Sequence, residues 1–247
     1  MKKSILMCLL LIGSLALNTV IAAVTVTVKQ QQYVFAHEPS LVEVLAPIAN
    51  HKNWYWPAVA LYQADDTKLE NIRISLLNNL STLANRYKTD EPEIAKSLEQ
   101  LQTAIASWRL ARRLSIPIDY DLARIVAAVN PRISKGQYIL NLAPRMDTVQ
   151  LFGAVNNPGD MTHLGHADIS EYITSHTRGD LANKDYVMLI QADGREVKAP
   201  VAYWNKAHQE VMPGSQIFVP FKESFFYPEW STVNQQIMTL APNRVWQ

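Results

Sequence analysis

A strand-like segment that ends in a Pro-Gly pair, Val149 to Met161, restricts the fold more than any other part of the sequence. Its apolar residues alternate, which is typical of a half-buried strand. Gly153 interrupts the run and indicates a bulge or a close backbone approach, because a side chain there would have to be accommodated. Pro158 sets φ for the second position of a tight turn, and Gly159 supplies the positive φ that a type II turn requires.

A second Pro-Gly pair, Pro213-Gly214, stands just before the apolar run from Gln216 to Val219. The two pairs bracket a segment of the size of one small β-rich domain. Between them the sequence predicts a helix over 169–173, strands over 186–191 and 196–204, and a hairpin turn at 192–195. We place this second domain at residues 146–227.

The first residues have the pattern of a secretory signal peptide. Lys2 and Lys3 precede an apolar stretch, and small residues allow cleavage after Ala22 or Ala23. A membrane anchor is the alternative, but the apolar run is short. The one cysteine, Cys8, lies inside this segment, so a mature chain has no disulfide and must be stabilised by its core. We therefore expect residues 1–22 to be a signal peptide and the protein to be periplasmic in a bacterium.

Charge and hydropathy exclude other classes of partner. The 247 residues include 23 basic and 22 acidic ones, and a chain that is nearly neutral is not expected to bind nucleic acid. No later apolar run is long enough to span a membrane. The sequence gives no prediction of the oligomeric state.

The beginning of the mature chain predicts a small α+β domain. Val24 to Val28 alternates as a strand does, and Tyr33 to Phe35 continues it as a hairpin. Ser40 and Glu43 form a capping box that opens a short helix. A further strand-like run, Gln137 to Leu142, closes this domain. The order is that of a ubiquitin-like (β-grasp) domain, among several α+β possibilities, and we place it at residues 23–145.

A helical hairpin at about 67–114 interrupts the first domain. Apolar residues recur every three or four positions in two stretches joined by a short turn, which indicates two antiparallel amphipathic helices. We expect Thr67 and Asp90 to cap them, and strand structure to return at 116–118. The hairpin is interpreted as an elaboration of the first domain, not as a second core.

The C-terminal segment, 228–247, predicts one more amphipathic helix. Its apolar face consists of Trp230, Val233, Ile237 and Leu240. The face can dock on its own domain, on a partner protein or on a membrane surface. The helix lacks the basic face typical of binding to anionic lipid, which weakens the membrane option. The other two remain open, so the four residues are a candidate partner-binding face.

The order of these elements resembles a known family. Leu151 to Gly159, together with Met212 to Val219, resembles the SLBB (soluble-ligand-binding β-grasp) domains of polysaccharide export proteins. The wider pattern is similar to the capsule-biosynthesis GfcC family over essentially the whole mature chain. The matching features are a signal peptide, Trp56-Pro57, the helical hairpin, Arg113-Leu114, an Asp-rich corner, the stretch 199–206 and the amphipathic tail.

The resemblance implies an α+β protein with two β-grasp domains, a helical insertion in the first and a C-terminal helix. It also implies a periplasmic accessory protein of capsule or exopolysaccharide assembly that works beside the outer-membrane export protein. Such a protein has a polysaccharide, the export protein or both as partners, and it does not form the pore itself.

Arginine and aromatic side chains are the candidate ligand-binding residues. Arg109 and Arg113 are four positions apart and are expected to share a helix face, with Arg113 where helix gives way to strand. The family pattern also has an arginine there. A guanidinium at that point can bind acidic sugars or a partner carboxylate, or it can simply interact with the helix dipole. Trp54, Tyr55 and Trp56 can stack on sugar rings or anchor the core.

Catalytic and metal sites have weaker signals. Asp119 with Asp121, or Asp65 with Asp66, could act as paired carboxylates in a glycan-modifying enzyme, but capping explains them as well. The histidines within 160–168 lie on a turn-rich segment with no spacing that directs both rings inward, so we predict neither metal nor cofactor. The sequence therefore favours a non-enzymatic accessory protein, with an enzyme or a purely structural assembly factor as alternatives.

Overall fold

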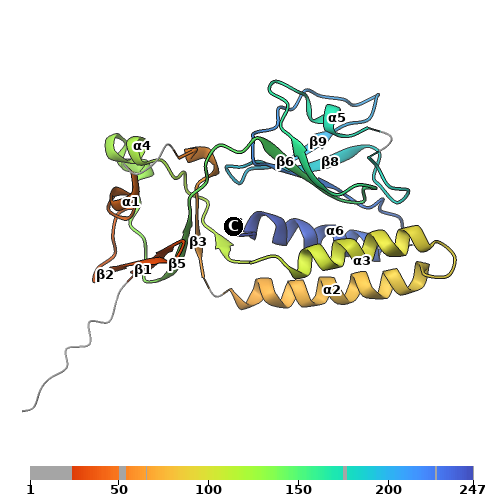
Figure 1. Ribbon diagram of the computed structural model, residues 1–247, viewed down its shortest axis with the longest axis horizontal. Coiled ribbons are helices and arrows are strands. Elements are labelled where there is room, and N and C mark those ends of the chain that lie inside the picture. The colour runs from red at the N-terminus through yellow and green to blue at the C-terminus, as the bar shows by residue number, and fades with distance from the viewer. Residues whose placement is uncertain (1–23, 50–53, 65, 175–176, 226, 247) are drawn as a thin grey trace, which may run out of the picture.

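The computed structural model describes residues 24–49, 54–64, 66–174, 177–225 and 227–246. The expected signal peptide lies outside the described residues. Within them the chain is a mixed α+β protein with two five-stranded mixed sheets and several helices. Figure 1 shows two lobes, one around each sheet, with long helices lying beneath the second sheet.

The two sheets repeat one topology. Their strand orders are β2-β1-β5-β3-β4 and β7-β6-β10-β8-β9, and in each the first and last strands of the sequence pair in parallel near the centre. The first sheet consists of β1 Val24–Val28, β2 Gln31–Phe35, β3 Ala60–Gln63, β4 Arg112–Arg113 and β5 Gly136–Asn141. The second consists of β6 Thr148–Gly153, β7 Gly159–Thr162, β8 Tyr186–Ile190, β9 Glu196–Pro200 and β10 Gln216–Val219. The expected division at 145/146 falls between β5 and β6.

Alternating side chains place the first core. Every second residue of β1 is buried, and α1 (Leu41–Ala49) covers that face with its apolar side chains. The capping box predicted for α1 is confirmed, because the Ser40 backbone N–H donates to Glu43 Oε2 over 2.7 Å and the Glu43 N–H donates to Ser40 Oγ over 3.4 Å. α4 (Tyr120–Ile125) packs beside α1, and the short helices Trp56–Ala58 and Ala127–Val129 complete this lobe.

The helical hairpin consists of α2 (Thr67–Tyr87) and α3 (Pro92–Ala106), inserted between β3 and β4. Its buried leucines belong to the same core as the second sheet, not to the first. The Trp108 and Phe152 ring centroids lie 5.7 Å apart, edge to face, where the hairpin meets β6. The hairpin is therefore inserted in the first domain along the sequence, as expected, but its apolar side chains pack in the core of the second sheet.

The ends of the hairpin differ from those expected. α3 ends at Ala106 instead of 114, and the chain is extended by the time it reaches β4. The segment 116–118 is not a strand, because its central residue is a proline, which cannot donate a ladder hydrogen bond. Asp66, not Thr67, caps α2 by accepting the Lys68 N–H over 3.0 Å. Glu91, not Asp90, stands at the cap of α3.

The Pro-Gly turns have different geometries. Gly214 has φ of +83°, and the Ser215 N–H donates to the Met212 carbonyl over 3.1 Å, as in a type II turn. Gly159 has φ of +146°, far from the value of about +80° that a type II turn requires. The reason is that Gly159 already pairs with Leu151 as the first residue of β7, a strand that the sequence did not predict.

The close approach expected at Gly153 is confirmed. A Cβ atom there would lie 2.3 Å from the Val219 carbonyl oxygen and 2.6 Å from the Phe218 ring, and φ is +101°. Glycine is the residue that tolerates both conditions. β6 can therefore lie directly beside β10 where α3 also meets the sheet.

The C-terminal helix, α6 (Glu229–Leu240), packs on its own chain. Trp230, Val233, Ile237 and Leu240 are all buried, and α6 lies beside α2 beneath the second sheet, on the face opposite α5 (Ile169–Tyr172) (Figure 1). The expectation that these four residues form a partner-binding face is therefore corrected: the chain's own core covers them. Among the described residues, no helix has the length and apolar character to cross a bilayer.

Asn234, a polar residue of the same helix, is also buried. Its Oδ1 accepts the Phe221 N–H over 2.9 Å, and its Nδ2 donates to the Phe221 carbonyl over 2.8 Å. The amide thus pairs with the backbone just after β10 as a neighbouring strand would. The short helix Ala241–Asn243 follows α6 and leads the chain back toward the first sheet.

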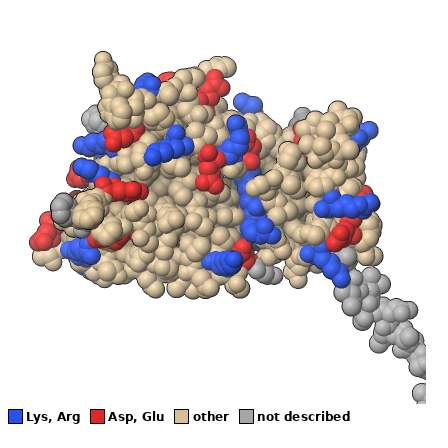
Figure 2. All heavy atoms as spheres, turned by 180° about the vertical axis from the view of Figure 1, so that it is seen from behind, with Lys and Arg blue, Asp and Glu red and all other residues tan. Residues whose placement is uncertain are grey.

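Charged side chains are distributed over both lobes. On the face seen from behind, basic and acidic groups alternate, and several basic ones lie at the narrow part between the lobes (Figure 2). This distribution agrees with a formal net charge of +1.

Candidate functional site

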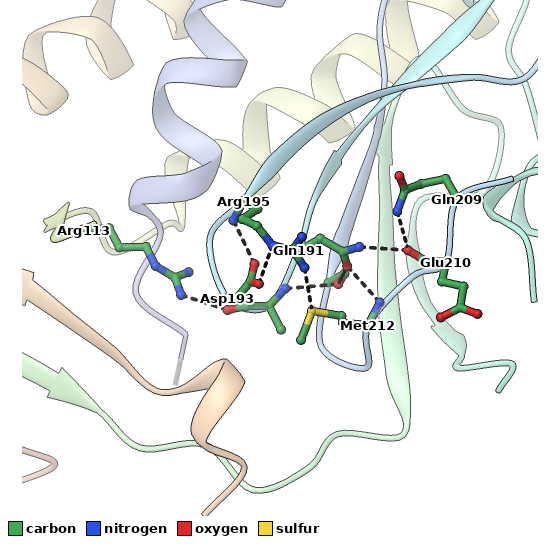
Figure 3. A network of polar contacts seen from close by, with 9 residues as sticks. Arg113, Gln191, Asp193, Arg195, Gln209, Glu210 and Met212 are labelled. Carbon is green, nitrogen blue, oxygen red and sulfur yellow. Dashed lines mark hydrogen bonds and ion pairs between the residues drawn. The ribbon is translucent and has the colours of Figure 1, made fainter. Parts of the chain in front are cut away.

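Arg113 lies where the two lobes meet. It is on β4, the edge strand of the first sheet, and its half-buried side chain extends to the turn between β8 and β9 (Figure 3). Its Nη2 donates to the Ala192 carbonyl over 2.8 Å, and its backbone N–H donates to Asn243 Oδ1 over 2.8 Å. The arginine predicted to hold a ligand is thus engaged by its own chain, and it links the two sheets.

Hydrogen bonds of the Gln191 side chain hold the turn that Arg113 contacts. Gln191 Oε1 accepts both the Met212 N–H and the Ser215 hydroxyl over 2.8 Å, and its Nε2 donates to the Glu210 carbonyl over 2.8 Å (Figure 3). Gly194 has φ of +89°, and a Cβ there would lie 2.7 Å from Arg113 Nε. The glycine that the sequence assigned only to a hairpin turn therefore also makes room for the guanidinium.

Arg109 and Arg113 do not share a helix face, because α3 has ended before either residue. Arg109 is exposed, and its carbonyl accepts the Val245 N–H over 2.8 Å. The Ala111 N–H donates to the Asn243 carbonyl over 3.0 Å. The last residues of the chain therefore lie beside the segment that leaves the hairpin, although more than half of the sequence separates them.

This pairing positions Arg244, a residue that the sequence analysis did not single out. Its guanidinium carbon lies 3.8 Å from the centre of the Trp246 ring and 5.1 Å from that of Trp108. Nη1 donates to Gln150 Oε1 on β6. Burial lowers the pKa of the Arg244 guanidinium to about 10, an effect that the nearby Asp160 carboxylate partly opposes.

A groove begins at Arg244 and follows the seam between α3 and β6. It consists of two adjoining pockets of about 310 and 210 Å³, which share Ser97, Gly153 and Val155 in their linings. We call it the α3–β6 groove. Glu93 and Asp180 line the far pocket, whereas Arg244 lines the near one. The near pocket is further lined by Gln100, Leu101, Ala104, Ser107, Trp108, Gln150, Leu151, Phe152, Pro158 and Gly159.

Trp54, Tyr55 and Trp56 lie elsewhere. Trp54 and Trp56 are partly buried against the first core, and Trp54 Nε1 donates to the Ile48 carbonyl over 3.2 Å. The Arg145 guanidinium carbon lies 5.3 Å from the centre of the Tyr55 ring. Trp54 and Trp56 thus anchor the junction of helix and strand, and as far as the chain is described none of the three side chains lines the α3–β6 groove.

The carboxylates considered for catalysis have structural contacts. Asp119 caps α4 by accepting the Leu122 N–H over 2.9 Å, and Asp121 lies 3.9 Å from Arg124. Asp66 caps α2, while Asp65 lies outside the described residues. Capping therefore accounts for Asp119 and Asp66, as the alternative interpretation expected.

The histidine-containing segment is also occupied by local contacts. The His163 ring Nε2 lies 2.8 Å from the Val211 carbonyl oxygen. Asp168 accepts the Ser170 N–H over 2.9 Å and forms a capping box with Glu171, so it caps α5. Within the described part of the chain, no group of three or more His, Cys, Asp or Glu side chains is arranged so that it could hold a metal ion.

Comparison with known proteins agrees with this architecture. The family model described as capsule biosynthesis GfcC, N-terminal, matches residues 19–145, and the model described as capsule biosynthesis GfcC C-terminal matches residues 157–246. The uncharacterized protein YjbG of Escherichia coli (strain K12) is 28% identical over 248 residues, which cover 99% of this chain and 98% of YjbG. The chain belongs to the GfcC family of capsule biosynthesis proteins.

Proposed function

We propose that this protein is a periplasmic, non-enzymatic accessory protein of capsule or exopolysaccharide assembly, and that it holds a polysaccharide chain in the α3–β6 groove. Membership of a capsule biosynthesis family supports the role in assembly. The observation that carries the binding site is the groove itself, which has an aromatic ring, amides and hydroxyls in its lining. Concave sites with mostly apolar walls and a few polar groups are where proteins bind ligands.

The dimensions of the groove suit a chain better than a single small molecule. The part of α3 and its C-terminal extension that lines the groove runs from Glu93 to Ser107, which is about 20 Å at a rise of about 1.5 Å per residue. The two pockets adjoin along this length. A chain of several sugar units can therefore contact both pockets at once.

We also infer that each sheet with its helix is a β-grasp domain. Both sheets have the same strand order, a central parallel pair, and a helix between the second and third strands. In this interpretation the second domain forms the groove between its strand β6 and α3. The helical insertion of one domain and the sheet of the other then build the site together.

A binding role has more support than the enzymatic alternative. Asp119 and Asp121 lie outside the lining of the groove, and the first of them is engaged in capping. Direct support for catalysis would come from incubating the protein with purified capsule polysaccharide and measuring chain length and substituents. We expect both to be unchanged. Shortened or modified chains would refute the non-enzymatic part of the proposal.

The binding part is tested by titrating the purified protein with capsule polysaccharide from the bacterium that makes it. Calorimetry and tryptophan fluorescence monitor the titration. Ala104→Trp is the blocking variant, because Ala104 is exposed on α3 and lines the groove. Lys96→Trp is the matched control, an exposed position on the same helix outside the lining. We expect the blocking variant to weaken binding by about tenfold or more, equivalent to about 1.4 kcal/mol, and the control to leave it unchanged.

Two results would contradict the proposal. The first is that the unaltered protein shows no affinity for the polysaccharide, and the second is that Ala104→Trp binds it as tightly as the control does. A parallel titration with the outer-membrane export protein then separates the two partner classes: binding of that protein that Ala104→Trp does not weaken would move the function to another surface.

A further inference from the structure

We propose that Arg244, between Trp108 and Trp246, is a subsite for the carboxylate of an acidic sugar in the bound chain. The inference rests on the proposed function, since it names the class of glycan that the α3–β6 groove takes. It concerns the near pocket, of about 210 Å³, in which both Trp108 and Arg244 are lining residues.

The two indole rings determine how the guanidinium can bind. Arginine has five N–H donors in the plane of its guanidinium group. The guanidinium carbon lies 3.8 Å from one ring centre and 5.1 Å from the other, so aromatic faces occupy the space beside the group. Such contacts are favourable cation–π interactions. They leave the edge of the group, with its donors, for a ligand.

Most of those donors are free within the described residues. The guanidinium makes one hydrogen bond, from Nη1 to Gln150 Oε1, and it has no carboxylate within ion-pair distance in the described part of the chain. Asp160 acts on it only at longer range. A carboxylate fits the planar fork of arginine through two parallel N–H···O bonds, which neutral sugar hydroxyls cannot reproduce.

The electrostatics around Arg244 also favour an anionic ligand. A half-buried cation without a paired anion is costly, and its lowered pKa reflects that cost. An anion that enters the near pocket would supply the missing countercharge. Glu93 and Asp180 lie at the other end of the groove, so the groove has a basic end and an acidic end. An acidic sugar is therefore directed to the pocket that contains Arg244.

The remaining lining selects a sugar over a free anion. Gln100 and Ser107 place an amide and a hydroxyl in the same pocket, and the largely buried Trp108 contributes to its apolar wall. These groups match the hydroxyls and C–H faces of a pyranose ring. A uronic acid combines such a ring with the carboxylate that Arg244 can bind.

The experiment compares two oligosaccharides of equal length, hexagalacturonate and maltohexaose, by calorimetry on the unaltered protein, Arg244→Gln, Arg244→Lys and Arg109→Gln. Inorganic phosphate serves as a third probe to separate a free-anion site from a sugar site. Arg109→Gln is the matched control, because Arg109 is exposed in the same region and contacts its neighbours through its backbone. Circular dichroism verifies that each variant is folded.

We expect the unaltered protein and the control to prefer hexagalacturonate over maltohexaose and phosphate. Arg244→Gln should lower affinity for hexagalacturonate by about tenfold or more and leave maltohexaose unchanged, since it removes a charge-assisted contact. Arg244→Lys should give an intermediate loss, because lysine keeps the charge but not the fork. Binding of the acidic glycan should also change tryptophan fluorescence, and Trp246→Phe should reduce that change.

Different failures identify different errors. If neither oligosaccharide nor capsule polysaccharide binds, the proposed function is wrong and the subsite with it. If glycans bind but Arg244→Gln changes neither affinity, the proposed function stands and the subsite is refuted. Equal effects of phosphate and hexagalacturonate would refute a sugar subsite in favour of a simple anion site. If Arg244→Gln does not fold, an unchanged glycan preference in Arg244→Lys and in Trp246→Ala refutes the subsite instead.

Discussion

Asn234 is the residue at which a small change should most clearly test how the C-terminal helix is held. Its side-chain amide is buried and pairs with both the N–H and the carbonyl of Phe221, over 2.9 and 2.8 Å. Phe221 is itself buried and stacks on Trp230, with ring centroids 4.6 Å apart. The amide therefore connects α6 to the end of β10 in a place that water does not readily reach.

Asn234→Ala removes both hydrogen bonds and leaves two buried backbone groups without a partner. Each such group costs about 1–3 kcal/mol, so the free energy of unfolding should fall by about 2–4 kcal/mol after partial relaxation. Gln235→Ala is the control, an exposed position next to it on α6, and should stay within about 0.5 kcal/mol of the unaltered protein. Urea unfolding followed by tryptophan fluorescence measures both.

Asn234→Asp provides a second, pH-dependent test. The carboxylate can still accept the Phe221 N–H, but it faces the Phe221 carbonyl and lies near Glu223, whose Oε1 is 3.3 Å from Nδ2 of the native residue. Burial and repulsion should raise the pKa of the new carboxyl in the folded state, so the destabilisation should grow as pH rises. A loss below about 1 kcal/mol for Asn234→Ala, or one equal to that of the control, would refute this account of the helix.

Three further predictions concern the strands, the junction and the first helix. Gly153→Ala should lower the free energy of unfolding by about 3 kcal/mol or more, because its Cβ would lie 2.3 Å from a carbonyl oxygen at φ of +101°. The control, Gly165→Ala, has open space around it and should be nearly neutral in the same urea assay. Arg113→Ala should cost about 1–2 kcal/mol through the lost bond between the lobes, and an equal cost for Arg109→Ala would contradict that role. Hydrogen bonds with the backbone and the side chain of Ser40 lower the pKa of Glu43 from 4.5 to about 2. The ionised Glu43 carboxylate should therefore stabilise the fold above pH 4.5, and this contribution should be lost as pH falls toward 2. An unchanged pH dependence of unfolding in Glu43→Gln would exclude that contribution.

Local patterns were enough for the elements whose stabilising contacts are close in sequence. The alternation of β1, the capping box of α1 and the turn at Gly214 all follow from neighbouring residues or from a requirement on one backbone angle. The same kind of pattern marked α2, α3 and α6 as amphipathic. The order of these elements also indicated the family to which the chain belongs.

The predicted secondary structure was wrong where a local sequence pattern is compatible with more than one backbone conformation. The end of α3 was placed too late because the arginines after Ala106 are good helix formers, yet the pairing of this segment with Asn243 and Val245 extends it. β7 was missed because a strand of four mostly exposed residues has almost no apolar alternation. In both cases a tertiary partner decided the conformation.

The sequence by itself determined which faces are apolar, where the chain turns and which glycines are needed, because these depend on composition and backbone sterics. The tertiary structure decided what each apolar face covers: the hairpin and α6 pack on the second sheet, not on the first sheet or a partner. It also decided the partners of Arg113 and Arg244, which lie 79 residues from Ala192 and 94 residues from Gln150 along the chain. Contacts of that range depend on how two sheets and three helices pack together, and no local pattern records them.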